Sequence, residues 1–313
     1  MQVRPLGQRG PTVSVVGLGG NNFGRPGSAT AGLEGTRAVL DAAIDSGITL
    51  IDTAEMYGVD FGQSESLIGA ALLGRRDEVL LATKFGHEAR RAPGTDDLAI
   101  GSRAYIRAAV DGSLSRLGTD RIDLYQQHTP DPRTPIDETS AALDELIDEG
   151  KILAYGHSNF AAAQMRAAAG GRWVSAQDEY SLIRRGAERE LLPTARDLEL
   201  GFLPYYPLFN GLLTGKFSRD LRPADTRLSR QRPELLESAP WDALDAYAEF
   251  CAERGITMLA ATFGWMLAQP PVSSVIAGAT LPEQVRANAD AATWTPEPDD
   301  VERISAIFSG EPA

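Results

Sequence analysis

The sequence predicts a (β/α)8 barrel, the TIM-barrel architecture, that begins with a β-hairpin and ends with a helix. Short apolar runs typical of buried parallel strands alternate with amphipathic segments along the whole chain. Roughly eight such strand–helix units fit within the 313 residues, and no change in composition marks a linker. Polar side chains also recur where the apolar runs end, which is where barrels of this kind carry their chemistry. We therefore expect one barrel domain over residues 1–313.

Local signals define the elements in order. Two extended runs, 3–6 and 12–16, flank a Gly- and Pro-containing turn and predict the hairpin. Helix 103–117 shows how helices are bounded, because Ser102 is a typical N-cap and Gly118 a typical C-terminal stop. The barrel strands are expected at 13–18, 48–52, 79–85, 122–127, 151–156, 173–177, 201–206 and 273–277. The helices are expected at 35–46, 64–73, 103–117, 136–149, 161–169, 188–198, 241–254, 259–269, 281–292 and 298–307.

One long segment, residues 210–240, has no regular pattern. It is rich in arginine and lysine, although the chain as a whole is acidic. Long loops inside compact domains are often functional lids. We expect this segment to be a candidate clamp for an anionic ligand.

Composition narrows the class of partner. The chain has 30 Lys and Arg against 43 Asp and Glu, a formal charge of −13, which argues against nucleic acid or an anionic membrane as partner. Its one cysteine, Cys251, excludes an intrachain disulfide and a thiolate metal cluster. The N-terminus lacks an apolar export signal, and the longest apolar stretch, 256–268, is too short to cross a bilayer. We expect a cytoplasmic protein with a small-molecule substrate, either a monomer or a homo-oligomer.

Four polar residues end or follow successive strands. Asp52 ends run 48–52, Tyr57 follows it, Lys84 lies at the end of 79–85, and His128 follows 122–127. A buried carboxylate needs a cationic partner, and Lys84 supplies one. A neighbouring ammonium lowers the pKa of a phenol. We therefore predict Tyr57 as general acid, Lys84 as the residue that tunes it, Asp52 as the anchor of Lys84, and His128 as the group that orients a carbonyl.

This set suits carbonyl reduction. No side chain can donate hydride, so a nicotinamide cofactor is required. A metal-dependent hydrolase is the alternative suggested by His87, His128 and His157, but no His-x-His pair exists and Lys84 would repel a cation, so we expect no metal. The glycines of 17–22 lack the third glycine of a Rossmann fingerprint.

At these positions the sequence resembles the aldo-keto reductases, specifically the bacterial NADPH-dependent oxidoreductases, over essentially its whole length. The matching motifs lie at 52–58, 82–84, 127–128, 156–159, 206–216 and 278–288. The resemblance implies a barrel with NADPH extended across its C-terminal face. It also implies that Asp52, Tyr57, Lys84 and His128 form the catalytic tetrad.

The resemblance further implies which residues hold the cofactor. Asp52, Gly20, Asn21, Ser158, Asn159, Gln177 and Tyr205 fall at the nicotinamide end; Pro207, Leu208, Gly211, Lys216 and Arg227 fall in the pyrophosphate loop; and Gly278, Thr280, Gln284 and Asn288 fall at the adenosine end. Many relatives carry cations near Ala279 and Gln284 to pair with the 2′-phosphate, so NADH is possible here beside NADPH. Tyr206 stands where close relatives usually have serine.

Two alternatives to a general carbonyl reductase remain. One is a nicotinamide-binding regulatory subunit, like the potassium-channel β subunits that share this fold. The other is a ketoreductase for a sugar or sugar-nucleotide intermediate. Specificity is expected in the loops 25–34, 87–100, 131–135 and 217–240, whose lengths are visible but whose shapes are not.

Overall fold

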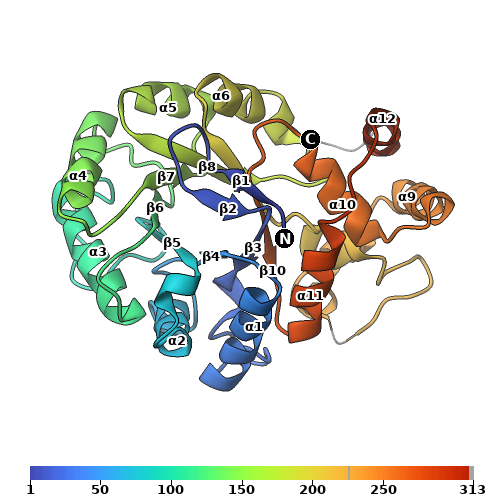
Figure 1. Cartoon of the computed structure of the whole chain (residues 1–313), viewed down its shortest axis with the longest axis horizontal. Coiled ribbons are helices and arrows are strands. Elements are labelled where there is room, and N and C mark those ends of the chain that lie inside the picture. The colour runs from blue at the N-terminus through green and yellow to red at the C-terminus, as the bar shows by residue number, and fades with distance from the viewer. Residues whose placement is uncertain (225, 310–313) are drawn as a thin grey trace.

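A computed structural model describes residues 1–224 and 226–309, without the side chain of Arg227. Eight parallel strands form a barrel surrounded by helices, which confirms the predicted (β/α)8 fold (Figure 1). The strands, in their order around the barrel, are β10 (Val275–Gly278), β3 (Val16–Gly19), β4 (Leu50–Asp52), β5 (Leu80–Phe85), β6 (Leu124–Gln127), β7 (Tyr155–Ser158), β8 (Trp173–Glu179) and β9 (Gly201–Tyr205).

The barrel is nearly closed. Strands β10 and β3 pair in parallel along four residues. Between β9 and β10 the connection is an isolated bridge between Phe202 and Val272, with the Ser273 N–H donating to the Phe202 carbonyl at 3.0 Å. The helices that follow the strands are α1 (Leu33–Asp45), α2 (Gln63–Ala71), α3 (Arg103–Leu117), α4 (Ile136–Asp148), α5 (Ala162–Ala167), α6 (Leu191–Asp197), α9 (Trp241–Arg254), α10 (Met258–Leu267), α11 (Pro282–Ala291) and α12 (Pro298–Ile307).

The N-terminal hairpin, β1 (Val3–Pro5) and β2 (Thr12–Ser14), covers one end of the barrel (Figure 1). Its Leu6 and Val13 join a buried cluster with inward-facing strand residues such as Leu50, Ala82 and Leu124. Because side chains alternate along a strand, the next inward-facing layer lies two residues further on. In β4, β5 and β6 that layer is polar, and it lies at the end opposite the hairpin.

Apart from shifts of a few residues at the ends of several elements, the clearest differences between predicted and observed elements lie in two places. The strand expected at 151–156 is displaced: β7 starts at Tyr155, and Ile152 makes only an isolated bridge to Ile122. The segment expected to be irregular contains three short helices, η5 (Phe209–Thr214), α7 (Arg227–Gln231) and α8 (Pro233–Glu237). Their signals are local, since Thr226 caps α7 and Pro233 opens α8.

Helix α3 has both of its predicted ends. The Ser102 hydroxyl accepts from the Tyr105 N–H at 3.3 Å, and Gly118 adopts a left-handed conformation at φ 62°. Within the described residues, no helix is long and apolar enough to cross a membrane.

Candidate active site

The polar end of the barrel is built around one ion pair. Lys84 Nζ in β5 lies 2.6 Å from Asp52 Oδ2 at the end of β4, and it also donates to the Thr53 carbonyl at 3.0 Å. The two side chains are 1% and 4% exposed. Burying two charges is expensive unless their other hydrogen-bonding groups are also satisfied. The structure therefore brings together the anion and cation that the sequence predicted.

Two carboxamides complete the shell around Asp52. Gln177 Nε2 in β8 donates to Asp52 Oδ1 at 3.0 Å, and Gln126 Nε2 in β6 donates to the same oxygen at 3.2 Å. Sequence reasoning missed Gln126. Its position two residues after Leu124 in an apolar strand was the available signal, because that spacing turns it into the barrel.

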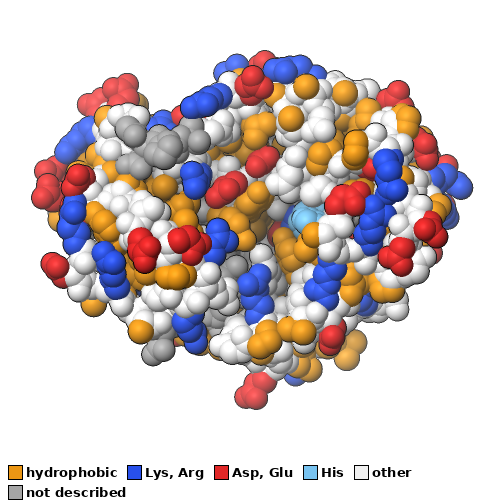
Figure 2. Space-filling view, turned by 180° about the vertical axis from the view of Figure 1, so that it is seen from behind, with side chains coloured by type: hydrophobic (Ala, Val, Ile, Leu, Met, Phe, Trp, Pro, Cys, Tyr) orange, Lys and Arg blue, Asp and Glu red, His pale blue; other side chains and the backbone are white. Residues whose placement is uncertain are grey.

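Tyr57 and His128 lie over this pair. Lys84 Nζ is 5.3 Å from the centre of the Tyr57 ring, and the Tyr57 and His128 rings meet edge to face with centroids 5.9 Å apart. The C-terminal end of the barrel thus brings all four tetrad residues into one cluster. Figure 2 shows a hollow in the middle of the face opposite the hairpin, with a histidine side chain beside it.

Burial sets the protonation of these groups. It lowers the pKa of Lys84, an effect that Asp52 opposes, and it lowers the pKa of His128 well below the usual range, with Lys84 and His87 adding to the effect. Burial, with Asp52 next, raises the pKa of Tyr57 above its ordinary value. This direction is opposite to the one predicted from the sequence. The reason is that burial has the largest influence on the pKa of this phenol, and the Asp52 carboxylate adds to the effect.

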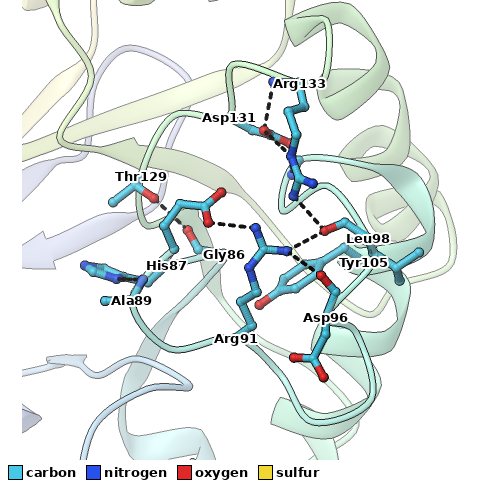
Figure 3. A network of polar contacts seen from close by, with 12 residues as sticks. Gly86, His87, Ala89, Arg91, Asp96, Leu98, Tyr105, Thr129, Asp131 and Arg133 are labelled. Atoms are coloured by element: carbon cyan, nitrogen blue, oxygen red, sulfur yellow. Dashed lines mark hydrogen bonds and ion pairs between the residues drawn. The ribbon is translucent and has the colours of Figure 1, made fainter.

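The other two histidines occupy different environments. His87 packs edge to face against His128, with centroids 4.8 Å apart, and its Nδ1 accepts from the Ala89 N–H at 3.2 Å. Figure 3 shows its ring turned away from Arg91 and Tyr105. His157 is buried behind Ser158 and stacks on Phe160 at 4.5 Å. Burial lowers the pKa of His157 to about 3.

A second polar group lies next to the tetrad. Asn159, at φ 60°, donates through Nδ2 to the His128 carbonyl at 3.0 Å and to Ser158 Oγ at 3.2 Å, and it accepts from the Tyr205 hydroxyl at 2.8 Å. Ser158 and Gln177 are paired across β7 and β8. The structure therefore brings the carboxamide-binding residues expected from the sequence to one edge of the tetrad. Tyr206, at φ 51°, meets Tyr205 edge to face.

Comparison with known proteins decides the family. A sequence model of the aldo/keto reductase family matches residues 15–308. This chain belongs to that family.

Three relatives illustrate the range of proteins that the chain is similar to. Aldo-keto reductase YhdN of Bacillus subtilis (strain 168) is 37% identical, covering 98% of this chain and 94% of the relative. The NADH-specific methylglyoxal reductase of Escherichia coli (strain K12) is 37% identical, covering 93% of each chain. A probable voltage-gated potassium channel subunit beta of Oryza sativa subsp. japonica is 32% identical, covering 100% of this chain and 98% of the relative.

Aldo/keto reductases use nicotinamide cofactors, and several features of the rim fit such a group. Gly278 of β10, which is exposed, pairs with the buried Gly19 of β3. A Cβ on the adjacent Gly20 would lie 3.2 Å from the Asp52 carbonyl and from Ser64 Oγ, so a larger residue there would press on the end of β4 and on α2. Asn21 accepts from Arg25 through its carbonyl at 2.8 Å. The donors and acceptors of Ser158, Asn159 and Gln177 match the chemistry of a carboxamide.

The residues expected at the pyrophosphate and the adenosine differ from one another in exposure and in hydrogen bonding. Gly211 has φ 104° within η5, next to the expected residues Pro207 and Leu208, and Lys216 is exposed. Thr280 donates to Gln284 Oε1 through its N–H at 2.8 Å and its hydroxyl at 3.2 Å. Asn288 is buried in α11. The side chain of Arg227 lies outside the described residues.

Proposed function

We propose that this protein reduces aldehyde or ketone carbonyls to alcohols with hydride from a reduced nicotinamide cofactor, using Tyr57 as general acid. The observation that carries the proposal is the buried Lys84–Asp52 pair at the polar end of the barrel, with the Tyr57 ring centre 5.3 Å from the ammonium. In this arrangement the Tyr57 phenol is the proton donor. The Lys84 ammonium is the cation that stabilises the phenolate left after the proton has been given. Membership of an oxidoreductase family supports the same reaction class.

Each tetrad residue has a distinct task in this proposal. His128 is neutral near pH 7, because its pKa lies well below the usual range, and it holds the substrate carbonyl by a hydrogen bond. Tyr57 is protonated before the reaction, because its pKa is raised, and it gives that proton to the carbonyl oxygen as hydride reaches the carbon. Lys84 stabilises the resulting phenolate, and Asp52 keeps Lys84 in position.

The cofactor supplies the hydride, and the rim residues hold it. We assign the nicotinamide carboxamide to Ser158, Asn159 and Gln177, and the face of its ring to Tyr205. The remaining assignments follow the family resemblance: Gly20, Asn21 and Asp52 beside the nicotinamide; Pro207, Leu208, Gly211, Lys216 and Arg227 at the pyrophosphate; Gly278, Thr280, Gln284 and Asn288 at the adenosine.

The choice between NADPH and NADH depends on the 2′-phosphate. The N–H and hydroxyl of Thr280 both donate to Gln284 Oε1, so two natural phosphate donors are already engaged. We therefore propose that both cofactors are accepted, with dissociation constants that differ by less than about tenfold. Titration of protein fluorescence with each cofactor measures this difference. Gln284→Arg should shift it toward NADPH, since a guanidinium pairs well with phosphate.

Turnover tests the function directly. With 4-nitrobenzaldehyde and NADPH or NADH, we expect many turnovers per protein molecule and 4-nitrobenzyl alcohol as the product. A single turnover or none, with tight cofactor binding, would instead favour a regulatory subunit, a role supported by the similarity to the channel subunit beta. A panel containing methylglyoxal, glyceraldehyde 3-phosphate and keto-sugars would then test narrower substrates, including a sugar-directed ketoreductase.

A further inference from the structure

One arginine outside the tetrad holds the turn that carries Tyr57. Arg90 lies on the loop between β5 and α3, and its guanidinium crosses to the turn after β4. Nη1 donates to the Met56 carbonyl at 2.8 Å and to the Gly58 carbonyl at 2.7 Å, and Nη2 donates to the Val59 carbonyl. Two of the three accepting carbonyls therefore lie immediately before and after Tyr57, and the third lies one residue further on.

Other contacts flank this turn: Gln63 Oε1 accepts from the Val59 N–H at 2.9 Å, and the Glu55 N–H donates to the Lys84 carbonyl at 3.0 Å. The turn belongs to neither a strand nor a helix. Tyr57 itself is held through its backbone by the Ala54 carbonyl at 3.0 Å and the Ser64 N–H at 3.1 Å. Gly58 has φ 106°, so the chain reverses direction beside the phenol. A planar guanidinium presents its donors in a fixed arrangement, so contacts on both sides of residue 57 fix the direction in which its side chain leaves the backbone.

Arg90 is in turn held by a loop that is fixed at several points (Figure 3). The neighbouring Arg91 donates to the Leu98 carbonyl at 2.7 Å and to the Asp96 carbonyl at 3.2 Å, which closes the loop on itself. The Ala92 N–H donates to the Tyr105 hydroxyl at 3.1 Å. The Ala92 contact, two residues from Arg90, ties the loop to α3, whereas the contacts of Arg91 stay within the loop.

A buried carboxylate ties the same two segments together from below. Glu55 Oε1 accepts from the Gly86 N–H at 2.8 Å and from the Tyr105 hydroxyl at 2.9 Å. Glu55 precedes Tyr57 by two residues, and Gly86 begins the loop that carries Arg90. The turn and the loop therefore form one unit, with Glu55 at its base and Arg90 at its outer end.

We propose that Arg90 is a positioning residue for the reaction, which orients the Tyr57 phenol by binding the backbone on both sides of it. This inference rests on the proposed role of Tyr57 as general acid. It predicts that losing the guanidinium misplaces the proton donor and leaves the cofactor rim intact, because the hydrogen-bond acceptors of Arg90 among the described residues are Met56, Gly58 and Val59, and none of these is assigned to the cofactor. The defect should therefore appear in the chemical step.

The experiment compares Arg90→Ala with Arg91→Ala in the full-length protein. Arg91 is the matched control, because it also binds backbone carbonyls through its guanidinium but only within its own loop. We expect Arg90→Ala to lower kcat by about 10- to 100-fold, the range that a displacement of about 1 Å produces. NADPH affinity, measured by fluorescence titration, should change less than about twofold, and Arg91→Ala should lower kcat by less than about threefold.

Coupling to Tyr57 distinguishes positioning from general loss of structure. If Arg90 acts through the phenol, Arg90→Ala should cause almost no further loss in a Tyr57→Phe background. Arg90→Lys keeps the test decisive if Arg90→Ala fails to fold, and guanidinium chloride at low millimolar concentration adds a rescue test if Arg90→Ala folds. Arg90→Lys should be slow, and guanidinium should restore part of the activity of Arg90→Ala.

Specific outcomes would overturn the inference. The inference fails if Arg90→Ala and Arg91→Ala lower kcat equally. It also fails if Arg90→Ala lowers kcat as much in the Tyr57→Phe background as in the wild type, or if Arg90→Lys is fully active. Near-normal turnover by Tyr57→Phe alone would instead overturn the proposed function. A slow Tyr57→Phe beside a fully active Arg90→Ala would leave the proposed function standing and remove only the role of Arg90.

Discussion

Two charged regions of this protein are organised in opposite ways. At the C-terminal end of the barrel, Lys84 and Asp52 are almost completely buried and surrounded by further hydrogen bonds. In the segment after η5, Arg219 is 48% exposed and pairs with Asp242 and Asp245 on the surface of α9. Removing one partner of a buried ion pair lowers the stability of the fold strongly, whereas an exposed ion pair contributes little to that stability. The comparison teaches that burial holds Lys84 and Asp52 in one arrangement. Arg219, in contrast, is held by surface ion pairs that water or another ion can replace.

The same comparison revises the idea of an anion clamp. The segment was expected to offer its arginines to a ligand. In the structure Arg219 pairs with acids of α9, Arg222 packs over Trp241 at 5.3 Å, and Arg232 pairs with Glu234. Lys216 is exposed. These arginines are engaged by the protein itself, so any binding of a ligand by them must replace weak surface contacts.

The largest expected effect comes from breaking the buried pair. Lys84→Met leaves Asp52 charged and unpaired inside the barrel, so we expect the free energy of unfolding to fall by about 3–5 kcal/mol. Urea denaturation measures it. In the double variant Asp52→Asn with Lys84→Met, stability should recover in part, but turnover should not. An unchanged unfolding midpoint for Lys84→Met would contradict the account of this region.

A second, smaller effect concerns Glu55. Burial raises the pKa of Glu55 to about 7, above the value near 4.3 expected in the unfolded chain. Between these values the folded state holds more protons than the unfolded state, so stability falls as pH rises from about 4.5 to about 7. The loss is on the order of 2–3 kcal/mol.

Glu55→Gln should remove this part of the pH dependence, because the amide oxygen still accepts from Gly86 and Tyr105 but the side chain does not titrate. Urea denaturation of both proteins at several pH values between 4.5 and 8 makes the comparison. Parallel curves for the variant and the wild type would show that Glu55 is not the group responsible.

The smallest effect is expected in the long segment. Arg219→Ala removes two surface ion pairs, and we expect the free energy of unfolding to change by less than about 1 kcal/mol. Asp245→Ala, which removes one of these pairs from the other side, is the matched control. A loss above about 2 kcal/mol in either variant would mean that the surface pairs are as important as the buried one, and the contrast between the regions would fail.

Sequence reasoning succeeded where one local rule decides the outcome. Helix α3 has its predicted ends because Ser102 and Gly118 each act within one turn of the helix. The Lys84–Asp52 pair was predictable because a buried carboxylate at a strand end requires a cation. The position of strand β7 was predicted wrongly, because an apolar run does not reveal which of its residues pair with the neighbouring strands.

Apart from the Lys84–Asp52 pair, contacts between distant segments were not predictable. For Gln126, the only local feature that indicates an inward-facing side chain is its spacing of two residues from Leu124. Arg90 and Glu55 each bind residues more than 30 positions away, in loops without periodicity. The direction of the Tyr57 pKa shift was predicted wrongly for a related reason, since it depends on how completely the fold buries the phenol.

The central claim is that Tyr57 delivers the proton that accompanies hydride transfer. A single-turnover experiment tests it most directly: protein is saturated with NADPH, mixed rapidly with 4-nitrobenzaldehyde, and cofactor oxidation is followed for the wild type and Tyr57→Phe. The account predicts that the variant binds NADPH within about twofold of the wild type but transfers hydride about 100- to 10,000-fold more slowly. Transfer within about threefold of the wild-type rate, at equal cofactor affinity, would contradict it.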